Sequence, residues 1–80
     1  MEFDQELDTR GLLCPIPILK TKVAMDKLPT GSVLKVVSTD PGSVRDMEAF
    51  ARQTRNPLLD SLQEGKDYVF FLRKEGVGNP

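Results

Sequence analysis

The sequence contains no histidine and only one cysteine, Cys14, among its 80 residues. Without histidine there can be no Cys–His catalytic pair, no histidine general base and no histidine metal ligand. A lone cysteine also excludes a disulfide within the chain and a thiolate-rich zinc site, so we expect no metal centre. Cys14 is therefore expected to be a free thiol, which indicates a reducing compartment such as the cytoplasm.

The chain also lacks long apolar runs and a strong net charge. Its apolar stretches are too short to span a membrane, and acids occupy the N-terminus where a signal peptide needs basic residues. Eleven basic and twelve acidic side chains leave a net charge of −1, which creates no overall field that attracts nucleic acid. We therefore expect a cytoplasmic protein that binds neither membranes nor, in a stable complex, nucleic acid.

Residues that cap or break helices indicate two helical segments. Residues 15–28 contain no glycine and are rich in Lys, Leu and Ala, and the breaker cluster 29–31 follows them. Asp40 followed by Pro41 is typical of a helix start with an N-capping aspartate. This second helix is expected to end near Arg55.

Alternating or β-branched apolar residues predict four strands, at residues 3–7, 33–37, 58–63 and 67–74. In the order β-α-β-α-β-β, two right-handed crossovers place both helices on one face of a four-stranded mixed sheet. The sequence thus predicts an α/β fold of the α+β two-layer sandwich type. We expect a single domain at residues 1–75 and a flexible tail at residues 76–80. The expected core consists of Leu7, Ile18, Met25, Leu28, Leu34, Val36, Val44, Met47, Phe50, Leu58, Leu62, Tyr68, Phe70 and Leu72.

Two prolines directly after the cysteine place it at the start of the first helix. Proline costs about 3 kcal/mol inside a helix but fits its first turn, so Pro15 and Pro17 put Cys14 at or just before the N-cap. The free N–H groups and positive dipole of a helix start stabilise an anion, so we expect the pKa of Cys14 to be lowered. Arg10, in the turn-like segment that ends at Gly11, would add to this field if the fold brings it close, as would Lys20 and Lys22.

A buried, inert cysteine is the alternative, since free cysteine often acts as a small apolar residue. The position of Cys14 at a helix start, between a turn and two prolines, favours a working thiol instead.

The motif Cys14-Pro15-Ile16-Pro17 lies in a wider frame, which includes the break at residues 28–31, the Asp40-Pro41 pair and the final strand at residues 68–74. In this frame, residues 5–74 resemble the TusA/SirA family of sulfur-carrier proteins, small domains identified by a Cys-Pro-x-Pro motif at the start of the first helix. The resemblance implies a fold similar to the C-terminal domain of bacterial translation initiation factor three. Pro15 and Pro17 match the motif prolines.

The same resemblance implies a sulfur carrier in which Cys14 accepts sulfane sulfur as a covalent persulfide, without a separate cofactor. The donor would be a cysteine desulfurase or a rhodanese-type protein, and the sulfur would pass to a downstream acceptor protein. Each step is formally a sulfurtransferase half-reaction of a monomeric carrier. Members of the family serve tRNA thiolation, sulfur oxidation and molybdenum-cofactor enzymes. Residues 4–8 and 39–46 look closer to the carriers of sulfur-oxidising or molybdenum-linked systems.

Apolar residues of the first helix fall on two sides. One stripe, which includes Ile18, fits the core, whereas other apolar residues are interleaved with lysines on a side where a two-layer fold offers little to pack against. Scattered surface apolar residues are normal, which is the simpler interpretation. The alternative is a docking surface for an acidic donor or acceptor protein. This helix-one surface consists of Ile16, Leu19, Lys20, Lys22 and Val23.

Two other functions compete with sulfur transfer. An RNA-binding module would use the lysines of the first helix and the arginines of the second as phosphate partners, but the neutral charge balance argues against it. A redox-sensing thiol would normally need a nearby resolving cysteine, and the sequence has none.

Overall fold

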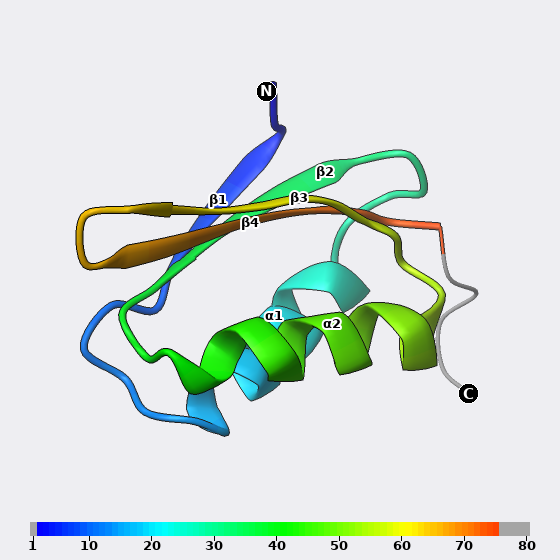
Figure 1. Cartoon of the computed structure of the whole chain (residues 1–80). Helices are drawn as coiled ribbons and strands as arrows, with labels where there is room; N and C mark the ends of the chain where they lie inside the picture. Colours follow the sequence, from blue (N-terminus) through cyan, green and yellow to red (C-terminus); the bar gives the residue numbers. More distant parts are fainter. Residues whose placement is uncertain (1, 76–80) are drawn as a thin grey trace.

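The computed structural model describes residues 2–75, so the tail expected at residues 76–80 lies outside the described residues. Its elements are β1 (Gln5–Asp8), α1 (Ile16–Asp26), β2 (Val33–Ser38), α2 (Gly42–Thr54), β3 (Leu58–Glu64) and β4 (Asp67–Arg73). The four strands form one sheet in the order β1-β2-β4-β3, and both helices lie on the same face of it (Figure 1). The predicted α+β two-layer sandwich is confirmed.

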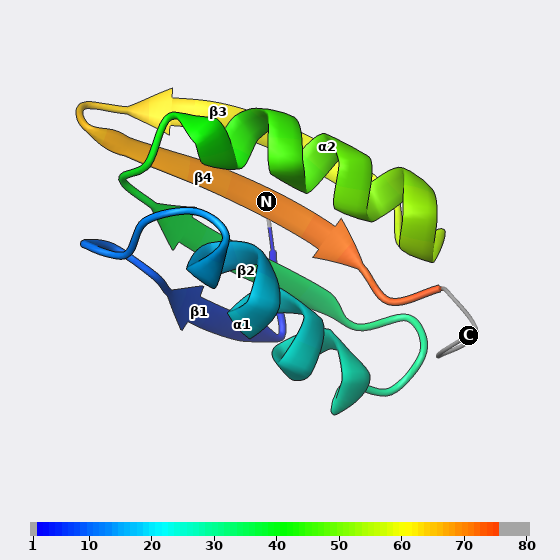
Figure 2. The same ribbon diagram turned by 90° about the horizontal axis from the view of Figure 1, so that it is seen from below.

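The direction of the strands decides where the helices begin. β1 pairs with β2 in parallel, while β4 is antiparallel to both β2 and β3. Figure 2 shows α1 against β1 and β2, and α2 against β4 and β3. Since β1 and β2 are parallel and each leads into a helix, α1 and α2 both begin at the same end of the sheet. The segments that follow β1 and β2 therefore meet there.

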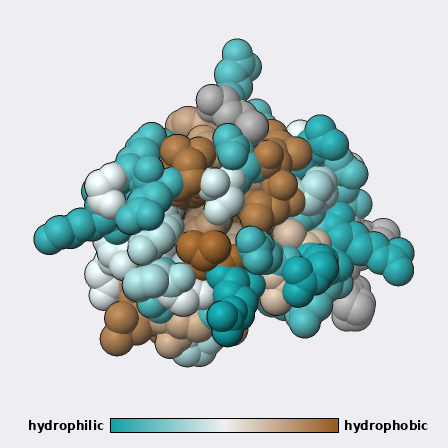
Figure 3. All heavy atoms as spheres, viewed as in Figure 1, coloured by the Kyte–Doolittle hydropathy of each residue, from teal (hydrophilic) through white to brown (hydrophobic). Residues whose placement is uncertain are grey.

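The core fills the space between the sheet and the helices. Figure 3 shows apolar side chains gathered in the middle of one face of the molecule, with polar side chains around them. Most of the predicted core is confirmed, and Ala51 belongs to it as well. The buried cluster consists of Met25, Leu34, Val36, Met47, Phe50, Ala51, Phe70 and Leu72, with Leu7, Ile18, Ala24, Leu28, Val44, Leu58 and Tyr68 packed against it.

Leu62 was wrongly predicted to be a core residue. An irregularity in the pairing of β3 with β4 lies between Leu58, which pairs with Leu72, and Asp60, which pairs with Phe71. The extra residue reverses the alternation of side chains along the rest of β3. Leu62 consequently pairs with Val69, on the face of the sheet that turns away from the helices.

Both helices are somewhat shorter than predicted. At the end of α1, the ammonium group of the buried Lys74 donates hydrogen bonds to the carbonyl oxygens of Met25 at 2.7 Å and Leu28 at 3.2 Å. α2 is followed by Arg55 in the left-handed conformation, with φ of 61°. Within residues 2–75, neither helix is long and apolar enough to cross a membrane.

Candidate functional site

A short loop between β1 and α1 carries Cys14. Its first residue, Thr9, is fully buried and donates through both its N–H and its hydroxyl to the carbonyl of Val37, at 2.8 and 2.7 Å. Two residues later, the N–H of Gly11 donates to the hydroxyl of Thr39 at 2.9 Å. Gly11 has φ of 83°, a conformation that favours glycine, so the chain turns here toward the loop that follows β2. The cysteine loop is thus tied to the end of β2.

Asp40 completes this link. One of its carboxylate oxygens accepts the backbone N–H of Cys14 at 2.6 Å, and the other accepts the N–H of Gly42 at 3.1 Å. α2 begins at Gly42 with Pro41 at the N-cap, one residue later than predicted, yet the Asp40 side chain still serves the start of that helix. One carboxylate therefore joins the first residues of α2 to the backbone of the candidate nucleophile.

The two prolines occupy the first turn of α1, as predicted. Pro15 is the N-cap residue, and Pro17 is the second residue of the helix and is buried. Cys14 thus directly precedes the N-cap, and the peptide bond that joins it to Pro15 is cis. Its thiol is free and exposed, so the burial considered above for this cysteine is not observed.

The electrostatics of Cys14 differ from the expectation. The thiol donates a hydrogen bond to the carboxylate of Asp46, in the second turn of α2. This hydrogen bond, partial loss of solvent contact and the negative charges of Asp46 and Asp40 raise the pKa of Cys14 to about 11, from an ordinary value of 9.0. The predicted lowering of the pKa is wrong, because two carboxylates outweigh the dipole of α1.

Of the three cations expected near the thiol, two pair with other acids and the third lines a groove. The Arg10 guanidinium pairs with Asp8 at 3.0 Å, where it holds the pKa of that carboxyl below its usual value, and lies 3.8 Å from Asp67. Lys22 pairs with Asp26 at 3.2 Å. Lys20 lines a groove between α1 and β1. Among the described residues, the charged groups that shift the pKa of Cys14 are both acidic.

A small hollow opens beside the thiol, between the start of α1 and α2. Its volume is about 360 Å³, and its lining includes Cys14, Ile18, Asp46, Phe50 and Gln53. Apolar side chains from both helices form part of the wall, while Asp46 and Gln53 supply the polar groups. The thiol and the carboxylate of Asp46 therefore line the same open hollow.

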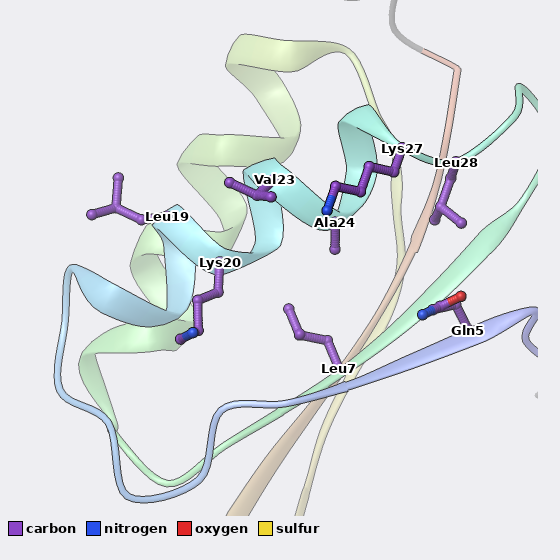
Figure 4. Close-up of a pocket in the computed structure, with 8 residues that line it drawn as sticks. All are labelled: Gln5, Leu7, Leu19, Lys20, Val23, Ala24, Lys27 and Leu28. Carbon is purple, nitrogen blue, oxygen red and sulfur yellow. The ribbon is translucent and has the colours of Figure 1, made fainter.

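The helix-one surface is exposed, as its pattern predicted. Ile16 is 40% exposed, and Leu19 and Val23 are each 54% exposed. Leu19 and Val23 border a groove of about 550 Å³ between α1 and β1. Figure 4 shows Leu7 of β1 pointing toward α1, between Lys20 and Ala24. Ile16 and Lys22 are not part of this groove's lining.

Thr39, Asp40 and Asp46 were missed as site residues. Asp40 was recognised only as a helix cap, although the parallel pairing of β1 with β2 places both helix starts at one end of the sheet. The predicted topology was therefore sufficient to place Asp40 near Cys14. No pattern in the sequence points to Asp46, which is 32 residues from Cys14 and reaches it only through the packing of α2 against α1.

Comparisons with known proteins identify similar chains. Residues 5–74 match a family model described as "Sulfurtransferase TusA". A sulfur carrier protein TusA from Allochromatium vinosum is 51% identical over 91% of this chain and 96% of its own length. A putative sulfur carrier protein YrkI from Bacillus subtilis is 39% identical over 92% of this chain and 99% of its own.

A solved structure supports the fold independently. The crystal structure of a SirA-like protein from Desulfitobacterium hafniense superposes with a TM-score of 0.78, over 88% of this chain and 96% of that one. The two sequences are 21% identical, so the likeness concerns the fold alone.

Proposed function

Because the chain belongs to the TusA sulfurtransferase family, we propose that it is a sulfur carrier that holds sulfane sulfur as a persulfide on Cys14. The observation that carries the proposal is the exposed, free thiol of the sequence's only cysteine, directly before the N-cap of α1. A carrier needs one accessible sulfur nucleophile. The persulfide is covalent, so the cargo needs no separate cofactor.

The chemistry is an exchange between cysteines. Cys14 attacks the outer sulfur of a donor persulfide, the donor's S–S bond breaks, and the donor cysteine leaves as a thiolate. An acceptor thiolate later attacks the outer sulfur on Cys14 in the same way. Each visit is half of a sulfurtransferase reaction, and a full turnover needs two partner proteins. A reducing compartment such as the cytoplasm suits a carrier whose single thiol must stay free.

The partners are a donor, of the cysteine desulfurase or rhodanese type, and a downstream acceptor protein. We place their contact on the helix-one surface, whose exposed apolar residues begin two positions after Cys14. The groove beside it has an apolar wall at Leu19 and Val23 and a basic side at Lys20 and Lys27. An acidic partner segment with an apolar face matches this combination.

RNA binding is not favoured as an alternative. The relatives that match nearly the whole chain are named as sulfur carriers. The net charge of −1 also gives RNA no general attraction.

Persulfide loading tests the proposal. The protein is incubated with a cysteine desulfurase and cysteine, or with a rhodanese and thiosulfate, and its intact mass is measured. We expect one added sulfur atom on the wild type and none on Cys14→Ser. A wild-type chain that no donor modifies would refute the proposal.

A further inference from the structure

Two carboxylates lie beside Cys14, and their roles differ: Asp40 binds its backbone N–H, whereas Asp46 accepts a hydrogen bond from its thiol. Asp40 is held in place by the N–H groups of Cys14 and Gly42, so it is part of the loop's framework. Within residues 2–75, the carboxylate of Asp46 has the Cys14 thiol as its one hydrogen-bond partner. Asp46 is half-buried and lines the open hollow between the two helices. It is therefore the carboxylate that another molecule can reach and neutralise.

We infer that Asp46 is a positioning residue that keeps the Cys14 thiol protonated in the free carrier, and that a partner releases the thiolate by presenting a cationic side chain to Asp46. This inference rests on the proposed function and adds the chemistry by which a partner is recognised.

A carboxylate in this place holds a proton on sulfur without removing it. The ordinary pKa of a thiol lies roughly four to five units above that of an aspartate, so a carboxylate is too weak a base to take the thiol proton. Its negative charge instead opposes the formation of a thiolate beside it. The raised pKa of Cys14 agrees with this geometry. Within the described residues, Arg10 and Lys22 pair with other acids, so these two cations do not neutralise the charge of Asp46.

A cation from a partner would shift Cys14 from the thiol toward the thiolate. When a lysine or arginine enters the hollow and pairs with Asp46, the charge that opposes the thiolate is neutralised. The apolar walls at Ile18 and Phe50 exclude part of the water, which strengthens such a pair. The fitting partner is thus a protein that carries a basic side chain close to its own persulfide or acceptor cysteine.

The transfer step balances without any further reactant. The Cys14 thiolate attacks the outer sulfur of the donor persulfide and forms a new S–S bond. The donor's S–S bond breaks, and its electron pair stays on the donor cysteine sulfur, which takes up the proton that Cys14 released. One S–S bond forms as another breaks, so no oxidant or reductant is consumed.

The first test is the pH profile of Cys14 alkylation by iodoacetamide in the wild type and in Asp46→Asn. Asparagine keeps the size of the side chain and removes its charge. We expect the midpoint of the profile to fall by about one pH unit or more, which corresponds to roughly tenfold faster alkylation at pH 7. Glu48→Gln removes the same charge from an exposed position on α2 and should leave the profile unchanged. Coinciding profiles of wild type and Asp46→Asn would overturn the inference.

The second test asks whether a cation is preferred at this site. Cys14 of the wild type is treated with cystamine, a dicationic disulfide, and separately with 3,3′-dithiodipropionate, a dianionic one. The rate with cystamine is divided by the rate with 3,3′-dithiodipropionate. We expect this ratio to fall by about three- to tenfold in Asp46→Asn and to stay constant in Glu48→Gln. Comparing ratios between variants cancels the intrinsic reactivity of the two disulfides. An equal ratio in wild type and Asp46→Asn would exclude release by a cation at Asp46.

Folding and loading controls separate the possible failures. Circular dichroism checks that Asp46→Asn is folded. If it is not, the wild-type ratio at low and high ionic strength decides, since a preference that salt does not weaken contradicts pairing at Asp46. A wild type that accepts sulfur from a donor but shows the same pH profile as Asp46→Asn overturns this inference alone. A wild type that accepts no sulfur refutes the carrier function itself.

Discussion

The carboxylate of Asp40 accepts the backbone N–H of Cys14 at 2.6 Å, across 26 residues of sequence. The same carboxylate accepts the N–H of Gly42 at the start of α2. The position of the thiol therefore depends on a residue of the second crossover, and the two halves of the β-α-β-α unit are joined at the site.

Asp40→Ala should destabilise the protein, because two backbone N–H groups lose their carboxylate acceptor. We expect a loss of about 1–2 kcal/mol in the free energy of unfolding, measured with urea. Asp26→Ala is the matched control, since it removes an acid from an exposed ion pair with Lys22 and should cost less than about 0.5 kcal/mol. Equal effects of the two substitutions would mean that Asp40 does not secure the loop.

Lys74→Met should destabilise α1, because the ammonium group of Lys74 caps carbonyl oxygens near the end of that helix. Hydrogen bonds with a charged donor stabilise a fold by about 1.5–3 kcal/mol, so a loss in this range is expected in urea unfolding. Lys66→Met alters an exposed lysine in the turn between β3 and β4 and serves as the control. A Lys74→Met variant as stable as Lys66→Met would contradict the capping role.

The raised pKa of Cys14 should make stability depend on pH in the alkaline range. Well below pH 9 the thiol is protonated in both the folded and the unfolded chain, so its contribution to the free energy of unfolding is fully present. Between about pH 9 and pH 11 the unfolded chain loses this proton more readily than the folded one, and stability falls as pH rises. Cys14→Ser should lack this component. The measurement is the difference between the two unfolding free energies from pH 8 to about pH 11, and a constant difference would contradict the raised pKa.

The helix-one surface should matter for transfer between proteins but not for the thiol itself. Leu19→Ser with Val23→Ser should speed dissociation of a protein donor, whereas Lys20→Glu with Lys22→Glu should slow its association. Sulfur transfer from the donor is measured beside loading by inorganic polysulfide. Transfer that survives both double substitutions in folded variants would place docking elsewhere. An equal loss of polysulfide loading would show that the site itself is damaged.

The architecture could be predicted because its signals are local. Breakers at residues 29–31 and the Asp40-Pro41 pair set the helices, and the handedness of the crossovers then placed them on one face. Leu62 could not be assigned to its face, because one extra residue near Leu59 reverses the alternation in β3. Such an irregularity leaves no sign in the pattern of apolar residues.

The site also has features that local sequence rules predict and features that only tertiary packing determines. Cys14 and its prolines follow from local rules for a helix start, and their positions were predicted. The pKa of Cys14 was not, since it depends on Asp46, which only the packing of α2 against α1 brings to the sulfur. A helix dipole is a weak local effect, and a carboxylate in contact with the thiol exceeds it.

Intact-mass spectrometry of the protein after incubation with a sulfur donor tests the central claim most directly. The wild type should gain the mass of one sulfur atom, peptide mapping should place it on Cys14, and a reductant should remove it. Cys14→Ser, which keeps the size of the side chain but not the nucleophile, should stay unmodified in the same mixture. A wild type left unmodified by desulfurase, rhodanese and polysulfide alike, or an added sulfur that persists in Cys14→Ser, would contradict a persulfide carried by Cys14.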